Sequence, residues 1–327
     1  MRTIDWIDGR VRIIDQTALP SELTVLELAR VEELIDAITS LAVRGAPALG
    51  VAGAMGVALI ARDPRYPTPD TVRTAAVALQ NARPTAVNLS WGVKQALLVA
   101  DQGADAILAA ALEVRDREIL NSTQMGERGA DLVAELKQGR LNVMTICNTG
   151  ALATVERGTA LSLVRSLFER DLLGEVIALE TRPLLQGARL TAWELSELGI
   201  PHRLTIDSAG PALISRGAVD LVVIGADRIA DNGDTANKVG SYSLALAAQR
   251  AGIPFIVVAP ESTVDAATAS GDDIEIEDRG SAEVVSLRGV AIAPAGTRAV
   301  NPAFDVTPHD LITAIVTESR VIRPNLP

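Results

Sequence analysis

The chain has 327 residues, of which 48% are hydrophobic and 22% charged, a composition that excludes a disordered or collagen-like protein. With 30 Lys and Arg against 41 Asp and Glu, the net charge of −11 argues against broad attraction to nucleic acid or to anionic membranes. One cysteine excludes an internal disulfide, and two distant histidines leave no Cys/His metal cluster. We therefore expect a reducing, cytoplasmic setting and no metal site.

The first 140 residues predict a small β element followed by helices. Two alternating runs, 2–7 and 10–14, flank Asp8 and Gly9, a dipeptide typical of a hairpin turn. Apolar residues then recur at spacings of three and four, which predicts helices at 25–44, 47–61, 69–82, 86–102 and 105–138. The most apolar run, 46–61, is shorter than the ~20 residues that a membrane helix needs, so no membrane span is expected.

The pattern changes after residue 140. Short runs rich in β-branched residues, each followed by a helical segment, predict βαβ units and a parallel sheet covered on both faces. These runs are 143–146, 176–179, 203–206, 221–224 and 255–258. The fold class is therefore α/β, and the stretch around Gly139 divides a β/helical domain, 1–140, from a parallel-sheet domain, 141–327.

Polar residues follow the predicted strands, and ligands bind at the carboxyl ends of such strands. Cys147, Glu180, Asp207 and Asp227 would bring a thiol and three carboxylates to one edge of the sheet. As an alternative, Asp207 and Asn148 only cap the helices that follow them. The convergence of four such positions favours a functional edge.

Two of these side chains suit catalysis. Cys147 precedes a predicted helix, whose positive N-terminal end would favour a reactive thiolate; the alternative is a small buried apolar residue. Asp227 follows an apolar strand and precedes Arg228, so it is either an ion-pair member or an acid suited to proton transfer.

Two segments suit an anion. Residues 231–238 predict a tight turn and then a helix with Asn237 and Lys238 in its first turn, where backbone N–H groups and a lysine suit a phosphate. Arg44, before the 47–61 helix, follows the same logic. Glycines spaced by three at 50–56 fail the dinucleotide pattern and predict close helix packing, which disfavours a nicotinamide dehydrogenase. A cofactor-free acid/base or thiol enzyme remains.

Five ordered blocks resemble the methylthioribose-1-phosphate isomerase family, whose superfamily also holds ribose-1,5-bisphosphate isomerases and regulatory subunits of translation initiation factor 2B. The blocks are 44–47, 83–89, 147–154, 181–195, and 225–228 through 237–238. The resemblance spans nearly the whole chain. It implies a small N-terminal domain joined to a Rossmann-like catalytic domain, usually in a homodimer.

The resemblance also implies roles for particular residues. Cys147 and Asp227 correspond to the catalytic pair. The substrate contacts correspond to Arg44, Gly45, Ala46, Arg83, Gln186, Asn237 and Lys238. Ile146 and Leu179 depart from the family, which usually has a histidine and an acidic residue at these positions.

The implied activity is isomerisation of 5-methylthioribose 1-phosphate to 5-methylthioribulose 1-phosphate in methionine salvage, by acid/base chemistry without a cofactor. One alternative is an isomerase of another pentose 1-phosphate, such as 5-deoxyribose 1-phosphate or ribose 1,5-bisphosphate. Another is a non-catalytic regulatory relative that binds a sugar phosphate or a nucleotide. The presence of both Cys147 and Asp227 counts against the regulatory alternative.

Overall fold

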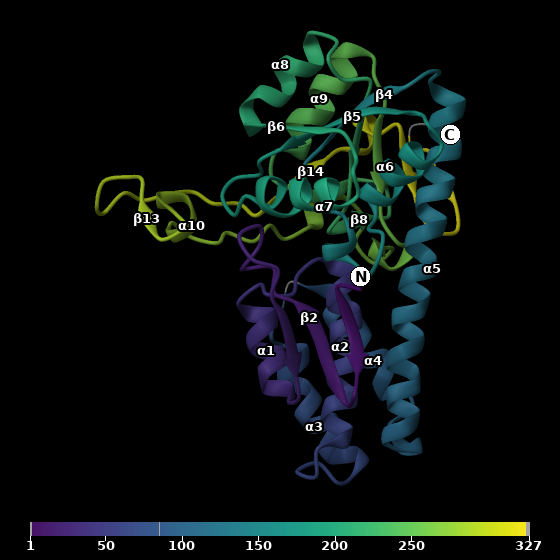
Figure 1. Ribbon diagram of the computed structural model, residues 1–327, viewed down its shortest axis with the longest axis vertical. Coiled ribbons are helices and arrows are strands. Elements are labelled where there is room, and N and C mark those ends of the chain that lie inside the picture. Colours follow the sequence, from purple (N-terminus) through teal and green to yellow (C-terminus); the bar gives the residue numbers. More distant parts are fainter. Residues whose placement is uncertain (1, 85, 325–327) are drawn as a thin grey trace. The chain divides into compact units, whose positions relative to one another are not determined.

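The computed structural model describes residues 2–84 and 86–324 and forms two compact units (Figure 1). The first unit comprises Met1–Thr123 and Thr149–Leu161, and the second comprises Gln124–Asn148 and Ser162–Pro327. Met1, Thr85 in the 83–89 block and residues 325–327 lie outside the described residues. The domain boundary predicted between residues 140 and 141 stays a prediction.

The first unit opens with an antiparallel sheet of β1 Ile4–Ile7, β2 Arg10–Ile14 and β3 Val25–Leu28. The predicted hairpin is confirmed, because β1 pairs with β2 and both Asp8 and Gly9 have positive φ, as a tight hairpin turn requires. The helix predicted to begin at residue 25 is wrong there. Val25–Leu28 instead pairs with β2, and this pairing overrides the local helical period.

Helices form the rest of the first unit. They are α1 Val31–Thr39, α2 Ala46–Arg62, α3 Pro69–Gln80, α4 Val87–Leu97 and the beginning of α5 Ala104–Leu136. Every residue of α2 from Ala48 to Ile60 is buried, so this helix is the centre of the unit's apolar core. Because α2 is surrounded, its sequence is apolar on all sides rather than on one stripe.

The glycines of α2 and α4 allow these two helices to pack closely, as their spacing predicts. A Cβ atom on Gly53 would lie 2.6 Å from the carbonyl oxygen of Leu89 in α4. A Cβ atom on Gly92 in α4 would overlap the carbonyl oxygen of Gly50 in α2. The glycines therefore serve helix contact, not dinucleotide binding.

Replacing Gly92 with alanine is expected to lower the free energy of unfolding by about 1–3 kcal/mol, because the added methyl group meets backbone that cannot move without separating the helices. Gly50→Ala is the matched control, since its Cβ would meet its nearest atom, the Asn88 oxygen, at 3.4 Å, an ordinary contact. Urea unfolding of both variants tests this. Equal midpoints for the two variants would contradict the packing argument.

The second unit contains the parallel sheet. Its strand order is β16–β15–β10–β7–β4–β5–β6, with β16 antiparallel to its neighbour and the rest parallel. The strands are β4 Leu141–Thr145, β5 Leu173–Leu179, β6 His202–Thr205, β7 Leu221–Ile224, β10 Phe255–Val258, β15 Ala314–Val316 and β16 Val321–Ile322. Strands β7 and β10 are buried at every position, so both faces of the sheet are covered there. The predicted Rossmann-like arrangement is confirmed.

Helices and a second sheet complete this unit. The helices include α7 Ala192–Glu197, α8 Gly210–Ser215, α9 Ser241–Ala251 and most of α6 Ala160–Glu169, whose first two residues belong to the first unit. The second sheet has the order β11–β8–β9–β14, with β8 Arg228–Ala230, β9 Thr235–Lys238, β11 Val264–Asp265 and β14 Phe304–Thr307. Since β8 follows β7 after three residues, this sheet begins beside the carboxyl end of the main sheet.

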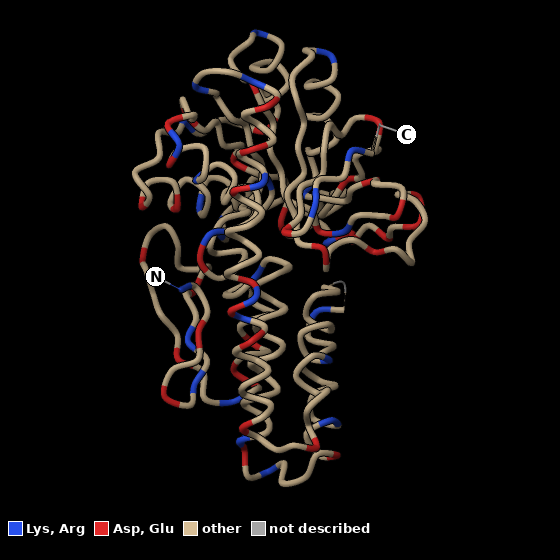
Figure 2. The backbone as a smooth tube through the Cα atoms, turned by 90° about the vertical axis from the view of Figure 1, so that its right-hand side faces the viewer, with Lys and Arg blue, Asp and Glu red and all other residues tan. Residues whose placement is uncertain are grey.

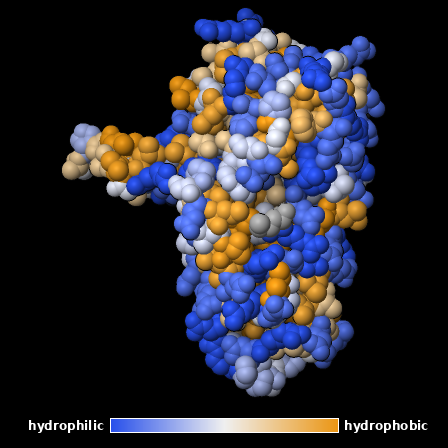
Figure 3. Space-filling model, viewed as in Figure 1, coloured by the Kyte–Doolittle hydropathy of each residue, from blue (hydrophilic) through white to orange (hydrophobic). Residues whose placement is uncertain are grey.

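An arm extends from the second unit (Figure 1). It consists of α10 Ala282–Val285 and a hairpin of β12 Ser286–Leu287 and β13 Val290–Ala291. Figure 3 shows hydrophobic side chains gathered over the arm. Val290 in β13 is 66% exposed, and Ile292, directly after β13, is 56% exposed. An apolar surface of this kind is typical of a contact with another protein surface.

Charged side chains are distributed along both units. Figure 2 shows Lys and Arg scattered among Asp and Glu along the backbone, including the long helix α5. In the ranges 2–84 and 86–324, no helix combines the length and the apolar character that a bilayer crossing requires.

Candidate active site

The candidate site begins where the main sheet reverses its winding. Strands β5 and β6 lie on one side of β4, whereas β7 and β10 lie on the other side. In open α/β sheets, ligands bind at the carboxyl ends of the strands beside such a reversal. Cys147 stands two residues after the end of β4, so the only cysteine of the chain lies at the position where this architecture binds ligands.

The predicted polar edge follows adjacent strands. Glu180 comes after β5, Asp207 after β6 and Asp227 after β7, and these strands lie side by side with β4 in the order β7–β4–β5–β6. Because the four strands are parallel, their carboxyl ends meet at one edge. Asp227 is exposed, and its backbone N–H donates to the carbonyl oxygen of Ala236 at 2.9 Å.

The helix predicted directly after Cys147 is wrong. The chain forms a short 3-10 turn at Ala151–Ala153, and α6 begins only at Ala160. The intervening loop is irregular, because Gly158 has a φ of 96° and packs so closely on Thr149 and Gly150 that a side chain has no room there. A helix dipole behind the thiol is therefore not part of this site.

The capping alternative is wrong for Asp207, whereas for Asn148 it stays untested. The Asn148 side-chain amide donates to Glu194 Oε1 at 2.7 Å and to Thr191 Oγ1 at 3.3 Å. The Asp207 carboxylate accepts the backbone N–H groups of Thr181 at 2.7 Å and Arg182 at 2.6 Å. The Asp207 carboxylate thus fixes the loop after β5 rather than the helix that follows it, and the Asn148 amide is bonded to the segment after that loop.

Two buried cations distinguish the candidate substrate residues. Among the described Lys and Arg side chains, Arg44 and Lys238 alone are buried, at 9% and 5% exposure. Buried cations are rare because removing a charge from water is costly, so such groups usually meet a partner or a ligand. Lys238 Nζ contacts neutral groups, the Ala303 carbonyl oxygen at 2.9 Å and the Phe304 ring at 4.8 Å. The Lys238 charge also acts on the Asp305 carboxyl, where it opposes the rise in pKa that burial causes. A buried ammonium with these partners is a candidate contact for an anion.

Asn237 and Lys238 do not occupy a helix, which corrects the prediction. They end strand β9, which pairs with β8 and with β14, and helix α9 starts only at Ser241. Pairing with distant β14 wins over the local helical pattern. The Asn237 side chain is 3% exposed and donates to Ser241 Oγ at 2.8 Å.

The start of α9 is already occupied by a carboxylate. Asp305 accepts the backbone N–H groups of Gly240 at 2.6 Å and Tyr242 at 3.1 Å. Sequence reasoning missed this residue, because it lies 65 positions from Gly240 and no local motif marks it. These N–H groups are therefore not available to a phosphate, and Lys238 Nζ is the candidate phosphate contact of this segment.

Burial raises the pKa of Asp305 to about 6 from its usual 3.8, against the opposing effect of the Gly240 and Tyr242 amides and the Lys238 charge. Between these values the folded chain holds a proton that the unfolded chain releases, so rising pH lowers the free energy of unfolding. As pH rises from about 4 to 6, the free energy of unfolding is expected to fall less for Asp305→Asn than for the wild type, because asparagine has no proton to release. Urea unfolding across this range tests it, and identical pH slopes would contradict it.

Gln186 adds an unsatisfied polar group. Its side chain is 6% exposed, and Oε1 has no hydrogen-bond partner in the described part of the chain. A buried oxygen without a partner is unfavourable unless a ligand supplies a donor. Gln186 directly precedes a π-helical turn, Gly187–Thr191, a rare conformation that is frequent at functional sites. These features fit a contact to a ligand hydroxyl.

The remaining substrate candidates lie in the first unit. Gly45, with a φ of 97°, and Ala46 lead into α2, and a Cβ on Gly45 would lie 2.5 Å from Cα of Ala153. Arg44 Nε donates to Gln16 Oε1 at 3.0 Å. Arg83 is partly exposed in the turn before α4. The positive φ and the close contact together require glycine at position 45.

The two departures from the family are apolar core positions. Ile146 and Leu179 are 0% and 1% exposed and belong to the apolar core of the second unit. Their side chains therefore pack against other apolar groups. Apolar packing therefore stands directly before Cys147 and Glu180, at the two positions where the resemblance implies polar groups.

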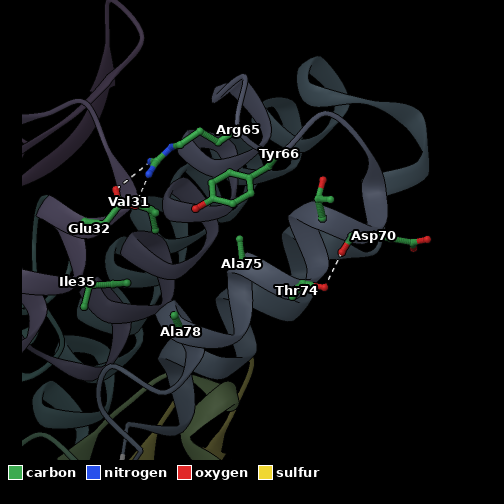
Figure 4. A pocket seen from close by; sticks show the side chains of 10 residues that line it. Val31, Glu32, Ile35, Arg65, Tyr66, Asp70, Thr74, Ala75 and Ala78 are labelled. Atoms are coloured by element: carbon green, nitrogen blue, oxygen red, sulfur yellow. Dashed lines mark hydrogen bonds and ion pairs between the residues drawn. The ribbon is translucent and has the colours of Figure 1, made fainter.

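A groove of about 520 Å³ between α1 and α3 is separate from these residues (Figure 4). Its charged side chains are already paired, since Arg65 binds Glu32 and Asp70 pairs with Arg73. None of the predicted site residues lines it. Elsewhere in the described ranges, no group of three or more His, Cys, Asp or Glu is placed to hold a metal ion.

The sheet and its edge define an α/β protein with a thiol at the ligand-binding position and buried cations in both units. The chain belongs to the initiation factor 2 subunit family, whose model matches residues 42–324.

Curated relatives match nearly the whole chain. A methylthioribose-1-phosphate isomerase from Chloroflexus aurantiacus is 46% identical over 99% of this chain and 96% of its own length. A 5-deoxyribose 1-phosphate isomerase from Moorella thermoacetica is 46% identical over 98% of this chain and 91% of its own length. A probable bifunctional methylthioribose-1-phosphate isomerase/methylthioribulose-1-phosphate dehydratase from Nocardia farcinica is 52% identical over 98% of this chain. The chain spans 60% of the length of this bifunctional relative.

Solved structures share the fold over both units. 5-Methylthioribose 1-phosphate isomerase from Pyrococcus horikoshii has a TM-score of 0.91 and 40% identity, covering 99% of this chain and 92% of its own. A structure from A. fulgidus described as translation initiation factor eIF-2B, subunit delta, has a TM-score of 0.89 and 43% identity, covering 99% of this chain and 96% of its own. The predicted family and fold class are thus confirmed.

Proposed function

We propose that this protein is an aldose–ketose isomerase that converts 5-methylthioribose 1-phosphate to 5-methylthioribulose 1-phosphate, a step of methionine salvage. The observation that carries the proposal is a single thiol at the sheet's reversal point, in the same unit as a buried lysine whose Nζ contacts the Ala303 carbonyl oxygen and the Phe304 ring. The similarity to isomerases of this name over nearly the whole chain supports the same substrate.

The substrate residues have the chemistry that a sugar phosphate requires. Lys238 and Arg44 supply buried positive charge for the phosphate, and Arg83 is a further cation that the family resemblance assigns to the substrate. The side-chain amides of Gln186 and Asn237 suit sugar hydroxyls. Gly45 and Ala46 place backbone N–H groups at the start of α2. We propose that each of these seven residues contacts the substrate.

The reaction moves hydrogen within the substrate and conserves its atoms. The hydrogen on C2 moves to C1, the proton of the C2 hydroxyl is lost, the ring oxygen gains a proton, and the phosphate stays on C1. We propose that Asp227 moves the proton at the sugar oxygens and that Cys147 assists the transfer between C1 and C2. Ile146 and Leu179 provide apolar surroundings directly before two residues of the polar edge, which limits access of water to a reactive intermediate.

The second candidate is isomerisation of 5-deoxyribose 1-phosphate, favoured by the relative of that name. The two sugars differ only at the 5-position, where a methylthio group would have to be accommodated. Because both reactions use the same acid/base chemistry at C1 and C2, the proposed roles of Cys147 and Asp227 serve either substrate.

A homodimer in a reducing, cytoplasmic setting belongs to the same proposal. The family resemblance implies the homodimer. The exposed apolar side chains of Val290 in the arm and of Ile292 directly after it support a contact with another protein surface. A single cysteine without a disulfide partner supports the reducing setting.

The test is an assay of the purified protein, without added metal or cofactor, with 5-methylthioribose 1-phosphate and 5-deoxyribose 1-phosphate in parallel. Ketose formation is followed by NMR. We expect turnover of both sugars, with the larger kcat/KM for the methylthio sugar. A larger value for the deoxy sugar would favour the second candidate, and turnover of neither would overturn the isomerase in favour of a regulatory binding protein.

A further inference from the structure

The backbone of Cys147 is held in an unusual conformation. Its φ is 66°, in the left-handed region that favours glycine and that other residues rarely adopt. Non-glycine residues in this region persist only when their surroundings fix them, and they cluster at functional sites. The contacts that fix this backbone therefore determine the direction in which the thiol side chain leaves it.

Two buried threonine hydroxyls hold both polar groups of this residue. The Cys147 N–H donates to Thr181 Oγ1 at 2.9 Å, and Thr191 Oγ1 donates to the Cys147 carbonyl oxygen at 2.6 Å. Thr181 Oγ1 in turn donates to the Leu179 carbonyl oxygen at 3.0 Å. Thr181 and Thr191 are 1% and 0% exposed, so water does not compete for these bonds.

Thr181 is itself fixed by the loop around it. Its φ is 68°, and the Asp207 carboxylate accepts its backbone N–H at 2.7 Å. Gly187 packs so closely that a Cβ would overlap the Leu179 carbonyl oxygen and lie 2.9 Å from Thr181 Oγ1. A β-branched residue in this conformation is strained, so the loop holds the hydroxyl in place at a cost to stability.

We propose that Thr181 is a positioning residue for the isomerase reaction, which fixes the Cys147 backbone so that the thiol meets the sugar carbons, with Thr191 completing the arrangement. This inference rests on the proposed function of Cys147. A residue that only supports the fold would change stability, whereas a positioning residue changes kcat and the reactivity of the thiol.

The test compares Thr181→Val, which keeps the shape and removes the hydroxyl, with Thr181→Ser, which keeps the hydroxyl. We expect Thr181→Val to lower kcat by about 10- to 100-fold with KM within about twofold, since small misplacements of reacting groups cost this much. Thr181→Ser is expected to retain kcat within about threefold. Thr307→Val is the matched control, because this buried hydroxyl has no partner in the described ranges.

A second readout does not depend on turnover. The chain has one cysteine, so the rate of alkylation by iodoacetamide reports Cys147 alone. We expect Thr181→Val to react at least about threefold faster than the wild type and Thr181→Ser at the wild-type rate, because a released backbone exposes the partly buried thiol. This difference is expected even if the wild type turns over neither sugar, which separates the inference from the proposed function.

Thr191→Val provides a second variant in case Thr181→Val does not fold. It removes the hydrogen bond to the Cys147 carbonyl oxygen. As for Thr181→Val, we expect a lower kcat and faster alkylation than in the wild type. A Thr181→Val protein with wild-type kcat and wild-type alkylation rate would overturn the inference. A loss of kcat that Thr181→Ser does not restore would also overturn it.

Discussion

Replacing Cys147 with serine is expected to abolish turnover of 5-methylthioribose 1-phosphate, with a loss in kcat of about 10³-fold or more. The hydroxyl of serine has nearly the size of the thiol, but it is a much weaker acid and nucleophile, so it cannot replace a thiol in the transition state. The substrate contacts are unchanged, and the substrate Kd is expected to stay within about threefold. The NMR assay measures kcat, and calorimetric titration measures Kd.

Chemical modification provides the control for this variant. Because Cys147 is the only cysteine, one equivalent of iodoacetamide is expected to inactivate the wild type, and bound substrate is expected to slow this reaction. The Cys147→Ser protein should not react, and it should unfold at the same urea concentration as the wild type. Wild-type kcat in the serine variant, or full activity after alkylation, would exclude a catalytic role for the thiol.

The strands and their polar ends were predictable because they depend on local sequence. Runs such as Leu221–Ile224 and Phe255–Val258 are short and wholly apolar, as buried parallel strands require, and both form strands. The strand β3 was not predictable from its period. Its residues are not buried on one helical face, and pairing with β2 decides their conformation. Strand order, which places Cys147 at the reversal point, also depends on contacts distant in sequence.

The site shows the same division between local and distant determinants. The cysteine and the acids stood out because polar residues after apolar strands are easily recognised. The threonines that hold Cys147 did not, because Thr181 and Thr191 lie 34 and 44 positions away from it. Lys238 was predicted to contact an anion from the first turn of a helix, but it lies in strand β9, where it pairs with Phe304. Its role in binding an anion stays a prediction. Burial of a cation is a tertiary property that no local pattern reveals.

The replacement of Asp227 by asparagine is expected to lower kcat by about 10²- to 10⁴-fold, the contribution of a positioned acid or base. Asparagine cannot accept or release a proton near neutral pH, so it cannot replace the acid or base. Because it keeps the size and polarity of the side chain, KM is expected to stay within about threefold. The backbone should not change, because the Asp227 N–H donates to the Ala236 carbonyl oxygen in either variant.

Asp231→Asn is the matched control for this second variant. Asp231 is also exposed, lies four residues away and loses the same charge, but it follows β8 rather than a strand of the main sheet. We expect wild-type kcat and KM for Asp231→Asn. Each variant removes one negative charge and so changes the attraction between the protein and the anionic substrate. If this attraction were the only effect, both variants would change KM equally and neither would lose kcat. A kcat for Asp227→Asn above about one tenth of the wild-type value would exclude proton transfer by this carboxylate.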